Sequence, residues 1–268
     1  MQTLKRYVPL LLPKLCCLAL LAPAVRAEPE LQACVADVMM APFAYWKLDP
    51  RKPAEPVGLA IDVLNAVSNR LKLPAAKVSV LPWRRCLQMM ESAQIDLALN
   101  VPTGQLSKLD FQLSEPYYTV HSWYFYSNRV HRNGLKINSA ADWRRWRVCG
   151  LQGYSLQAYG IDAAMVDSGS HDFRSLLGKL KTNRCDLFIE KREVIAGLYL
   201  IDPALGTLLF DPEIDHAPVP DDPDSDLRFA FSRKSMRMNG LRGQFDQQIQ
   251  AMKQSGEIER LMARYIQQ

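Results

Sequence analysis

Residues 81 to 118 read LPWRRCLQMMESAQIDLALNVPTGQLSKLDFQLSEPYY, and this stretch decides the fold. Four side chains near its start recur at the spacing of one helix face, namely Trp83, Cys86, Leu87 and Met90. Residues 95–99 follow as a short apolar run that only Asp96 interrupts, which is typical of a strand buried on both faces. The stretch therefore predicts a helix that leads into a buried strand.

A polar loop follows this predicted strand. Residues 100–108 read NVPTGQLSK and include Asn100, Thr103, Ser107 and Lys108. In an open α/β sheet, ligands bind in the crevice beyond the carboxyl ends of the strands. The loop is therefore the first candidate for a ligand site.

The rest of the chain alternates predicted strands and helices, which indicates two successive α/β units with parallel sheets and right-handed crossovers. Strands are expected at residues 30–39, 78–81, 119–127, 146–151, 186–190 and 227–232. Helices are expected at residues 58–73, 155 onward, 173–180, 194–200 and through the tail after 241. The Pro- and Asp-rich segments 49–58 and 211–226 are expected to be loops.

The first 27 residues differ from the rest. This stretch has a positive n-region at Lys5, an apolar h-region at 15–21 and a cleavage site with small residues before it. The pattern predicts a signal peptide over residues 1–27, cleaved after Ala27. A membrane anchor needs about 20 apolar residues, more than this stretch has. A lipid anchor on Cys16 or Cys17 stays open as an alternative, although neither cysteine follows the small residue that such a site requires.

Composition and charge are ordinary for a soluble globular protein, with 48% hydrophobic and 23% charged residues. Removing the leader removes four positive charges and no negative one, so the net charge falls from +5 to +1. This balance gives no support for a nucleic-acid partner, which needs a basic stripe on the mature domain. The arginines at 84–85 and 144–147 form local clusters typical of solvated helix faces.

The mature chain has four cysteines, which allow three pairings in an oxidising compartment. Closeness in sequence favours Cys34 with Cys86 and Cys149 with Cys185, one bridge in each α/β unit. Buried free thiols are the alternative. The spacing fits neither a zinc site nor a thioredoxin-like motif, so no metal or other cofactor is expected.

Nine short segments, each weak alone, follow one another in an order that resembles the periplasmic solute-binding proteins of family 3, which serve polar amino-acid transporters. They are residues 41–43, 58–62, 82–83, 95–98, 113–118, 148–153, 185–188, 228–234 and 256–265. The resemblance implies the α/β, two-lobe periplasmic binding protein type 2 fold, in which two hinge strands join mostly parallel sheets flanked by helices. Lobe 1 would comprise residues 28–119 and 227–268, and lobe 2 residues 120–226.

The same resemblance implies a non-catalytic, monomeric periplasmic protein that captures a small polar solute and presents it to a transporter permease. The family's stacking positions match Met40, Phe43, Tyr45 and Trp83, although core packing is an equal alternative for Phe43 and Trp83. Further ligand-binding candidates lie at predicted strand ends or helix starts, namely Asp37, Asn100, Thr103, Tyr117, Tyr154 and Ser155. Ser155 as a plain helix N-cap is the alternative there.

Two positions depart from the family pattern. The arginine that holds the α-carboxylate of an amino acid is replaced by Ser107, or by Lys108 after a one-residue gap. Lysine lacks the planar fork of arginine, so the exchange is not conservative. The acid that holds the α-amino group falls on Lys191, next to Glu190. Both departures argue against the usual α-amino-acid contacts.

Three other functions deserve comparison. Certain periplasmic dehydratases resemble this family, but the four histidines, at 121, 131, 171 and 216, are scattered and suggest no acid–base constellation. A ligand sensor for a signalling partner would share the same two-lobed design. Copper binding by Met39, Met40, Met89 and Met90 is conceivable, but methionine is far more often flexible core filler.

Overall fold

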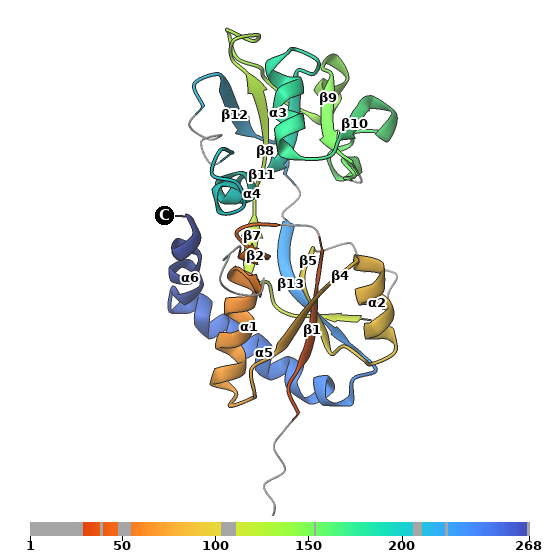
Figure 1. Cartoon of the computed structure of the whole chain (residues 1–268), viewed down its shortest axis with the longest axis vertical. Coiled ribbons are helices and arrows are strands. Elements are labelled where there is room, and N and C mark those ends of the chain that lie inside the picture. Colours follow the sequence, from red (N-terminus) through yellow and green to blue (C-terminus); the bar gives the residue numbers. More distant parts are fainter. Residues whose placement is uncertain are drawn as a thin grey trace, which may run out of the picture.

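The computed structural model describes residues 29–37, 40–47, 55–102, 111–152, 154–205, 211–222 and 225–266. The predicted signal peptide lies outside these residues, as do Thr103, Ser107 and Lys108. Two lobes lie one above the other along the long axis of the molecule, each built on one sheet (Figure 1). In the part of the chain that the structure describes, no helix has both the length and the apolar character needed to cross a membrane.

The sheet of lobe 1 has the strand order β4-β1-β5-β13-β6, and β7 also pairs with β13. β1 is parallel to β4 and β5, as predicted, whereas β13 returns from lobe 2 and is antiparallel to β5. The strands of this sheet are β1 (Gln32–Ala36), β4 (Lys77–Leu81), β5 (Leu97–Pro102), β6 (Phe111–Leu113), β7 (Tyr118–Val120) and β13 (Ser225–Ser232). A separate hairpin is formed by β2 (Tyr45–Lys47) and β3 (Glu55–Val57), and β3 lies within residues 49–58, where the sequence predicted a loop.

Helices cover both faces of this sheet, and burial of their apolar faces stabilises them. Three helices share the larger core cluster, and α2 covers the smaller one around Cys34. The helices are α1 (Leu59–Arg70), α2 (Trp83–Glu91), α5 (Met236–Gln254) and α6 (Glu257–Ile266). The predicted helix face of α2 is confirmed, because Cys86 and Met90 are fully buried and Trp83 packs beside them.

The sheet of lobe 2 has the order β10-β9-β11-β8-β12, with β8 antiparallel to its two neighbours. Its strands are β8 (Ser122–Ser127), β9 (Val148–Leu151), β10 (Val166–Ser170), β11 (Leu187–Lys191) and β12 (Ile214–Pro218). Its helices are α3 (Phe173–Lys181), α4 (Arg192–Gly197) and the short 3-10 helices η1 (Ala140–Arg145), η2 (Gln157–Tyr159), η3 (Ala163–Met165) and η4 (Leu198–Leu200).

Two sequence expectations in lobe 2 are wrong. Residues 211–226 contain the edge strand β12 rather than a continuous loop. No helix begins at Ser155; only the three-residue η2 follows it, and the Ser155 hydroxyl accepts a bond of 3.4 Å from the Gln157 amide. Ser155 is therefore a turn residue, and no α-helix N-terminus is present there to bind an anion.

The same helix–turn–strand unit occurs once in each lobe. α2 ends at a turn in which Ala93 has a φ of 56°, and α3 ends at a turn in which Asn183 has a φ of 55°. After each turn, an aspartate immediately before the strand binds a backbone amide of the neighbouring segment. Asp96 accepts from the Gln32 amide and Asp186 from the Arg147 amide, each at 2.8 Å.

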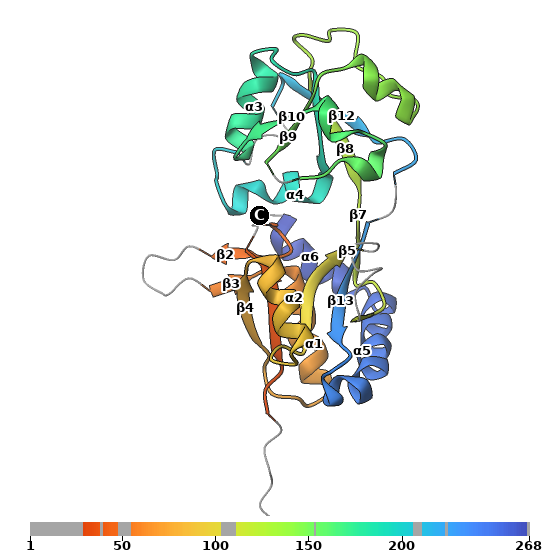
Figure 2. The same ribbon diagram turned by 90° about the vertical axis from the view of Figure 1, so that its right-hand side faces the viewer.

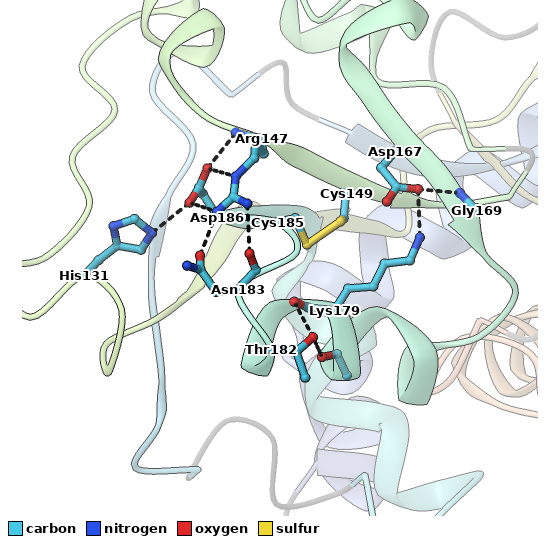
Figure 3. The surroundings of a disulfide bond; sticks show 11 residues. His131, Arg147, Cys149, Asp167, Gly169, Lys179, Thr182, Asn183, Cys185 and Asp186 are labelled. Carbon is cyan, nitrogen blue, oxygen red and sulfur yellow. Dashed lines mark hydrogen bonds and ion pairs between the residues drawn. A yellow bond between two sulfur atoms is a disulfide. The ribbon is translucent and has the colours of Figure 1, made fainter.

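Both predicted disulfides are present. Cys34 on β1 is bonded to Cys86 on α2, and Cys149 on β9 is bonded to Cys185, just before β11. Figure 3 shows the second bond beside the ion pair between Arg147 and Asp186. Each disulfide therefore ties a sheet strand to the helix–turn–strand unit of its own lobe.

Candidate functional site

The two lobes present the carboxyl ends of central strands to each other. The turn at residues 41–44 follows β1, and α4 follows β11. These two segments touch, because an added Cβ at Gly197 of α4 would lie 2.6 Å from the backbone of Ala41. Two crossing segments join the lobes at one side, between β7 and β8 and before β13 (Figure 2). Ligands of α/β sheets bind at such strand ends, so this interface is the candidate site.

On the lobe 1 side, Asp37 follows β1 and its side chain is exposed. It stands at the rim of a small pocket beneath the β2–β3 hairpin. The pocket is lined by Val35, Ala36, Asp37, Ala44, Tyr45, Trp46, Pro56 and Val80. With room for about one water molecule, the pocket is too small to hold a solute by itself.

The aromatic candidates differ in what they can contact. Phe43 is 0% exposed and belongs to the core of lobe 1, so packing accounts for it without a ligand. Tyr45 is buried in the pocket wall, with its ring 6.3 Å from that of Tyr265. Trp83 is half-buried against the cluster around Cys86. Met40 is half-buried and pairs with Ala44 through two backbone bonds of 2.9 Å.

Tyr117 supports the site from inside the core. It is 1% exposed, its hydroxyl donates to Asn100 Oδ1 at 2.6 Å, and it accepts from the Asn100 amide at 3.1 Å. Burial raises the pKa of the Tyr117 phenol, against the opposing effect of the Asn100 amide. Asn100, the fourth residue of β5, has a φ of 56°, a conformation that asparagine tolerates better than most residues. Its Nδ2 is buried and has no hydrogen-bond partner among the described residues, so this group is a donor that a ligand can satisfy.

On the lobe 2 side, Glu190 is the buried acid at the end of β11. It is 9% exposed, and its Oε1 accepts from the Lys191 amide at 2.7 Å. Burial raises the pKa of Glu190 to about 7, although the Lys191 amide and ammonium lower it. Burial and the nearby Glu190 carboxylate also raise the pKa of Tyr154, whose ring is 42% exposed. Glu190 and Tyr154 thus lie near each other.

Lys191 is bound to the crossing segments. Its Nζ donates to Ser122 Oγ at 2.6 Å and to Ser225 Oγ at 2.9 Å, and it lies 5.7 Å above the Tyr159 ring. Ser122 opens β8 and Ser225 opens β13, which are the strands that carry the chain into and out of lobe 2. The sequence did not indicate these serines, because they lie 69 and 34 residues from Lys191. The ammonium therefore ties β11 to both crossing strands.

A direct contact between the lobes runs along α4 and η4. Val194 packs in the core cluster of lobe 1, and Gly197 lies against the backbone of residues 41–42. The Tyr199 hydroxyl donates to the Tyr265 carbonyl at the end of α6. The path of the chain brings α4 so close to lobe 1 that only glycine fits at position 197 without a shift of backbone.

Gly197→Ala is expected to separate the lobes at this contact and to lower the free energy of unfolding by about 1–3 kcal/mol, because the new methyl group meets backbone that cannot rotate away. Small-angle X-ray scattering should show a larger radius of gyration. Gly178→Ala is the matched control, since Gly178 lies in α3 with nothing within 4 Å of an added Cβ. The control should gain about 0.5–1 kcal/mol. Equal radii for both variants would contradict this role of Gly197.

His121 and His131 each lie beside an acidic side chain. His121 Nδ1 lies 2.8 Å from Glu193 Oε1 beside the crossing segment, whereas His131 lies 3.3 Å from Asp186 before β11. Among the residues that the structure describes, no three His, Cys, Asp or Glu side chains gather as a metal site would require. These geometries place the histidines in structural contacts.

The two lobes with facing strand ends, joined by two crossing segments, form the two-lobe architecture that the sequence predicted. A family model, bacterial extracellular solute-binding proteins, family 3, matches residues 33–268, and the chain belongs to this family. Membership makes it a binding protein rather than an enzyme, as the sequence predicted. No curated protein matches the chain at a significant level.

Solved structures share the fold at low identity. The substrate-binding protein AbpA of an amino acid ABC transporter from Streptococcus pneumoniae, bound to L-arginine, is 22% identical, with a TM-score of 0.61, covering 89% of this chain and 94% of that one. The arginine-, lysine-, histidine-binding protein ArtJ from Geobacillus stearothermophilus is 14% identical, with a TM-score of 0.61 and coverages of 90% and 96%. The GluR0 ligand-binding core with L-glutamate is 13% identical, with a TM-score of 0.66 and coverages of 90% and 99%.

Proposed function

We propose that this protein captures a small polar solute between its lobes outside the cytoplasm and presents it, as a monomer, to the permease of a membrane transporter. In this proposal, lobe 1 comprises residues 28–119 and 227–268, lobe 2 comprises residues 120–226, and residues 1–27 direct export. The observation that carries it is the facing pair of strand ends, with the unpartnered Asn100 Nδ2 on one side and the buried Glu190 on the other.

The ligand contacts proposed in lobe 1 are Asp37, Met40, Tyr45, Trp83 and Asn100. Thr103, Ser107 and Lys108 complete the proposed set on that side, although the structure does not describe them. Tyr154 and Glu190 are the contacts proposed in lobe 2. Phe43 and Tyr117 act through the core, and Lys191 acts through the crossing strands.

Among solute classes, the similar structures favour a cation. The proposed contacts include two carboxyl groups, Asp37 and Glu190, and the Lys191 ammonium keeps its charge but donates to Ser122 and Ser225. AbpA and ArtJ, which share the fold, bind arginine or related basic amino acids. The departures at Ser107 and Lys191 from the family's amino-acid contacts favour cations without the usual α-amino-acid head, such as polyamines and guanidinium compounds.

A thermal-shift screen tests the function, because a ligand that binds only the folded protein raises its melting temperature. The screen should cover basic amino acids, polyamines, opines, small carboxylates and sugars. A hit is expected among the cations, and its affinity should fall at least tenfold in Asn100→Ala or Glu190→Gln, a loss of about 1.4 kcal/mol. Conversion of a hit to a new product, seen by mass spectrometry, would contradict the binding role.

The pH dependence of stability tests the burial of Glu190 without any ligand. The folded-state pKa of about 7 lies above the usual 4.5, so the folded protein binds more protons between these values. The stability that this protonation supplies is complete below about pH 4.5 and is lost as pH rises through about 7. The Glu190→Gln variant lacks this pH dependence. Its free energy of unfolding, relative to that of the wild type, should therefore be higher at about pH 8 than at about pH 5, by on the order of 1–3 kcal/mol.

Urea unfolding at both pH values measures this difference. Glu91→Gln, an exposed position on α2, is the control and should change stability equally at both. A pH-independent difference between Glu190→Gln and the wild type would show that Glu190 is solvated in the folded protein.

A further inference from the structure

The positive charge of the mature chain is concentrated in one segment. Residues 128–147 contain six basic residues and one acid, a net charge of +5. With the leader removed, the whole chain carries only +1, so all other residues together carry −4. Charge asymmetry of this size within one domain points to an anionic partner.

This segment is a fixed part of the fold. It runs from the end of β8 through η1 to the start of β9. Trp143 of η1 is 1% exposed, the Tyr124 hydroxyl donates to the Leu135 carbonyl at 3.0 Å, and Asp142 accepts from the Asn138 amide at 3.0 Å. Figures 1 and 2 both place it at the end of lobe 2 farthest from lobe 1.

Four of its six cations have no acidic partner in the part of the chain that the structure describes. Arg145 pairs with Asp142 at 3.2 Å and Arg147 with Asp186 at 2.9 Å, the latter visible in Figure 3. The Arg129 guanidinium donates only to the Lys181 carbonyl, which leaves its charge in place. The remaining three are exposed and have no acid within 4.0 Å among the described residues: Arg132, Lys136 and Arg144.

The acids on the neighbouring elements compensate these four only in part. Asp211 and Glu213, before β12, lie 2.6 and 4.0 Å from the Lys181 ammonium. Asp215 of β12 accepts from the Tyr126 hydroxyl at 2.9 Å, and its side chain is 51% exposed, so its carboxylate offsets one of the positive charges nearby. The outer end of lobe 2 therefore still projects an excess of positive charge into solvent.

We propose that this end of lobe 2 binds an anionic phospholipid surface. The cations are spread over a loop and a 3-10 helix instead of converging on one group, which suits a charged plane better than a single ligand. Attraction to such a surface acts within a Debye length, about 8 Å at physiological salt. The family is extracellular, so its members can meet the head groups of membrane phospholipids, which form a polyanionic surface. Bound this way, the protein keeps the interface between its lobes free, because that interface is at the opposite end of lobe 2.

Sedimentation of the full protein with lipid vesicles tests the proposal. The wild type should bind vesicles of phosphatidylglycerol and phosphatidylethanolamine at low salt, release at high salt, and ignore phosphatidylcholine vesicles. Arg132→Glu/Lys136→Glu/Arg144→Glu should weaken the binding at least about a hundredfold, since each of the three lost basic residues contributes about a fivefold factor and the new carboxylates add repulsion. Circular dichroism should show that this variant retains its fold.

A matched variant separates position from net charge. Lys77→Glu/Arg84→Glu/Arg85→Glu carries the same change in charge on exposed positions of lobe 1 and should bind the vesicles within about threefold of the wild type. Equal losses in both variants would overturn the proposal, because net charge alone would then explain binding. Failure of the wild type to prefer anionic vesicles would overturn it as well. Neither outcome touches the solute-binding function, which the thermal-shift screen tests independently.

Discussion

Replacing Asp96 with alanine is expected to lower the free energy of unfolding of lobe 1 by about 3–5 kcal/mol, the usual cost of breaking a buried ion pair from one side. The Asp96 side chain is 9% exposed. Its carboxylate accepts from the Gln32 amide and from the Ser235 hydroxyl at 2.8 Å each, and it pairs with the Arg237 guanidinium. Its removal takes the carboxylate acceptor from an amide and a hydroxyl and leaves the Arg237 guanidinium without its counter-ion.

The three partners come from distant parts of the chain. Gln32 lies in β1, and Ser235 and Arg237 lie where β13 leads into α5. Arg237 also donates to the carbonyls of Pro29 and Glu30 at 2.6 and 2.8 Å. Asp96 therefore holds the first strand, the central strand and the returning strand together at the base of lobe 1.

Asp186→Ala is the matched control, because Asp186 occupies the same position in the helix–turn–strand unit of lobe 2. Its partner Arg147 has a side chain 55% exposed, so water replaces part of the lost interaction. We expect a loss of about 1–2 kcal/mol there. Urea unfolding followed by fluorescence and by circular dichroism measures both variants. Equal losses of unfolding free energy in Asp96→Ala and Asp186→Ala would show that burial of the Asp96–Arg237 ion pair does not determine the loss in lobe 1.

Much of the fold follows from local pattern. The helix face of α2 and the apolar run of β5 could be predicted, because each element buries residues at its own period. The disulfide partners could be predicted because each pair lies within one α/β unit. By contrast, β12 escaped prediction: its residues include Asp215, His216 and Pro218, and its pairing is only with β8 across some 90 residues. Strand propensity depends on such partners more than on the residues themselves.

The candidate site was predicted less well, since its chemistry depends on long-range contacts. Tyr117 looked like a ligand residue beside a predicted strand, but it is buried and positions Asn100. Lys191 looked like a ligand contact, but two serines from the crossing strands bind its ammonium. The sequence alone therefore indicated that these residues lie near strand ends, whereas their contacts depend on segments that only the folded structure brings together.

Breaking the disulfide between Cys34 and Cys86 is expected to lower the free energy of unfolding by about 4 kcal/mol. The bond closes a loop with a sequence separation of 52 residues, and the closure entropy of an unfolded loop of this length amounts to about 4 kcal/mol in the chain-entropy model. Both cysteines are 0% exposed and lie in the small core that α2 makes with the sheet. Loss of the link therefore acts mainly on β1 and α2.

Two forms of the protein separate the link from the packing. Reduction of the wild type removes only the covalent bond and keeps both sulfur atoms in the core, whereas Cys34→Ala/Cys86→Ala removes the bond and leaves a cavity. Reduction of this bond and the double substitution should both lower the free energy of unfolding. We expect the loss to be at least about 1 kcal/mol larger in the double variant, because it also lacks two buried sulfur atoms. The measurement uses a Cys149→Ala/Cys185→Ala background, in which reductant acts on the lobe 1 bond alone. If reduction left urea unfolding unchanged in that background, the closure entropy of the 52-residue loop would not stabilise lobe 1.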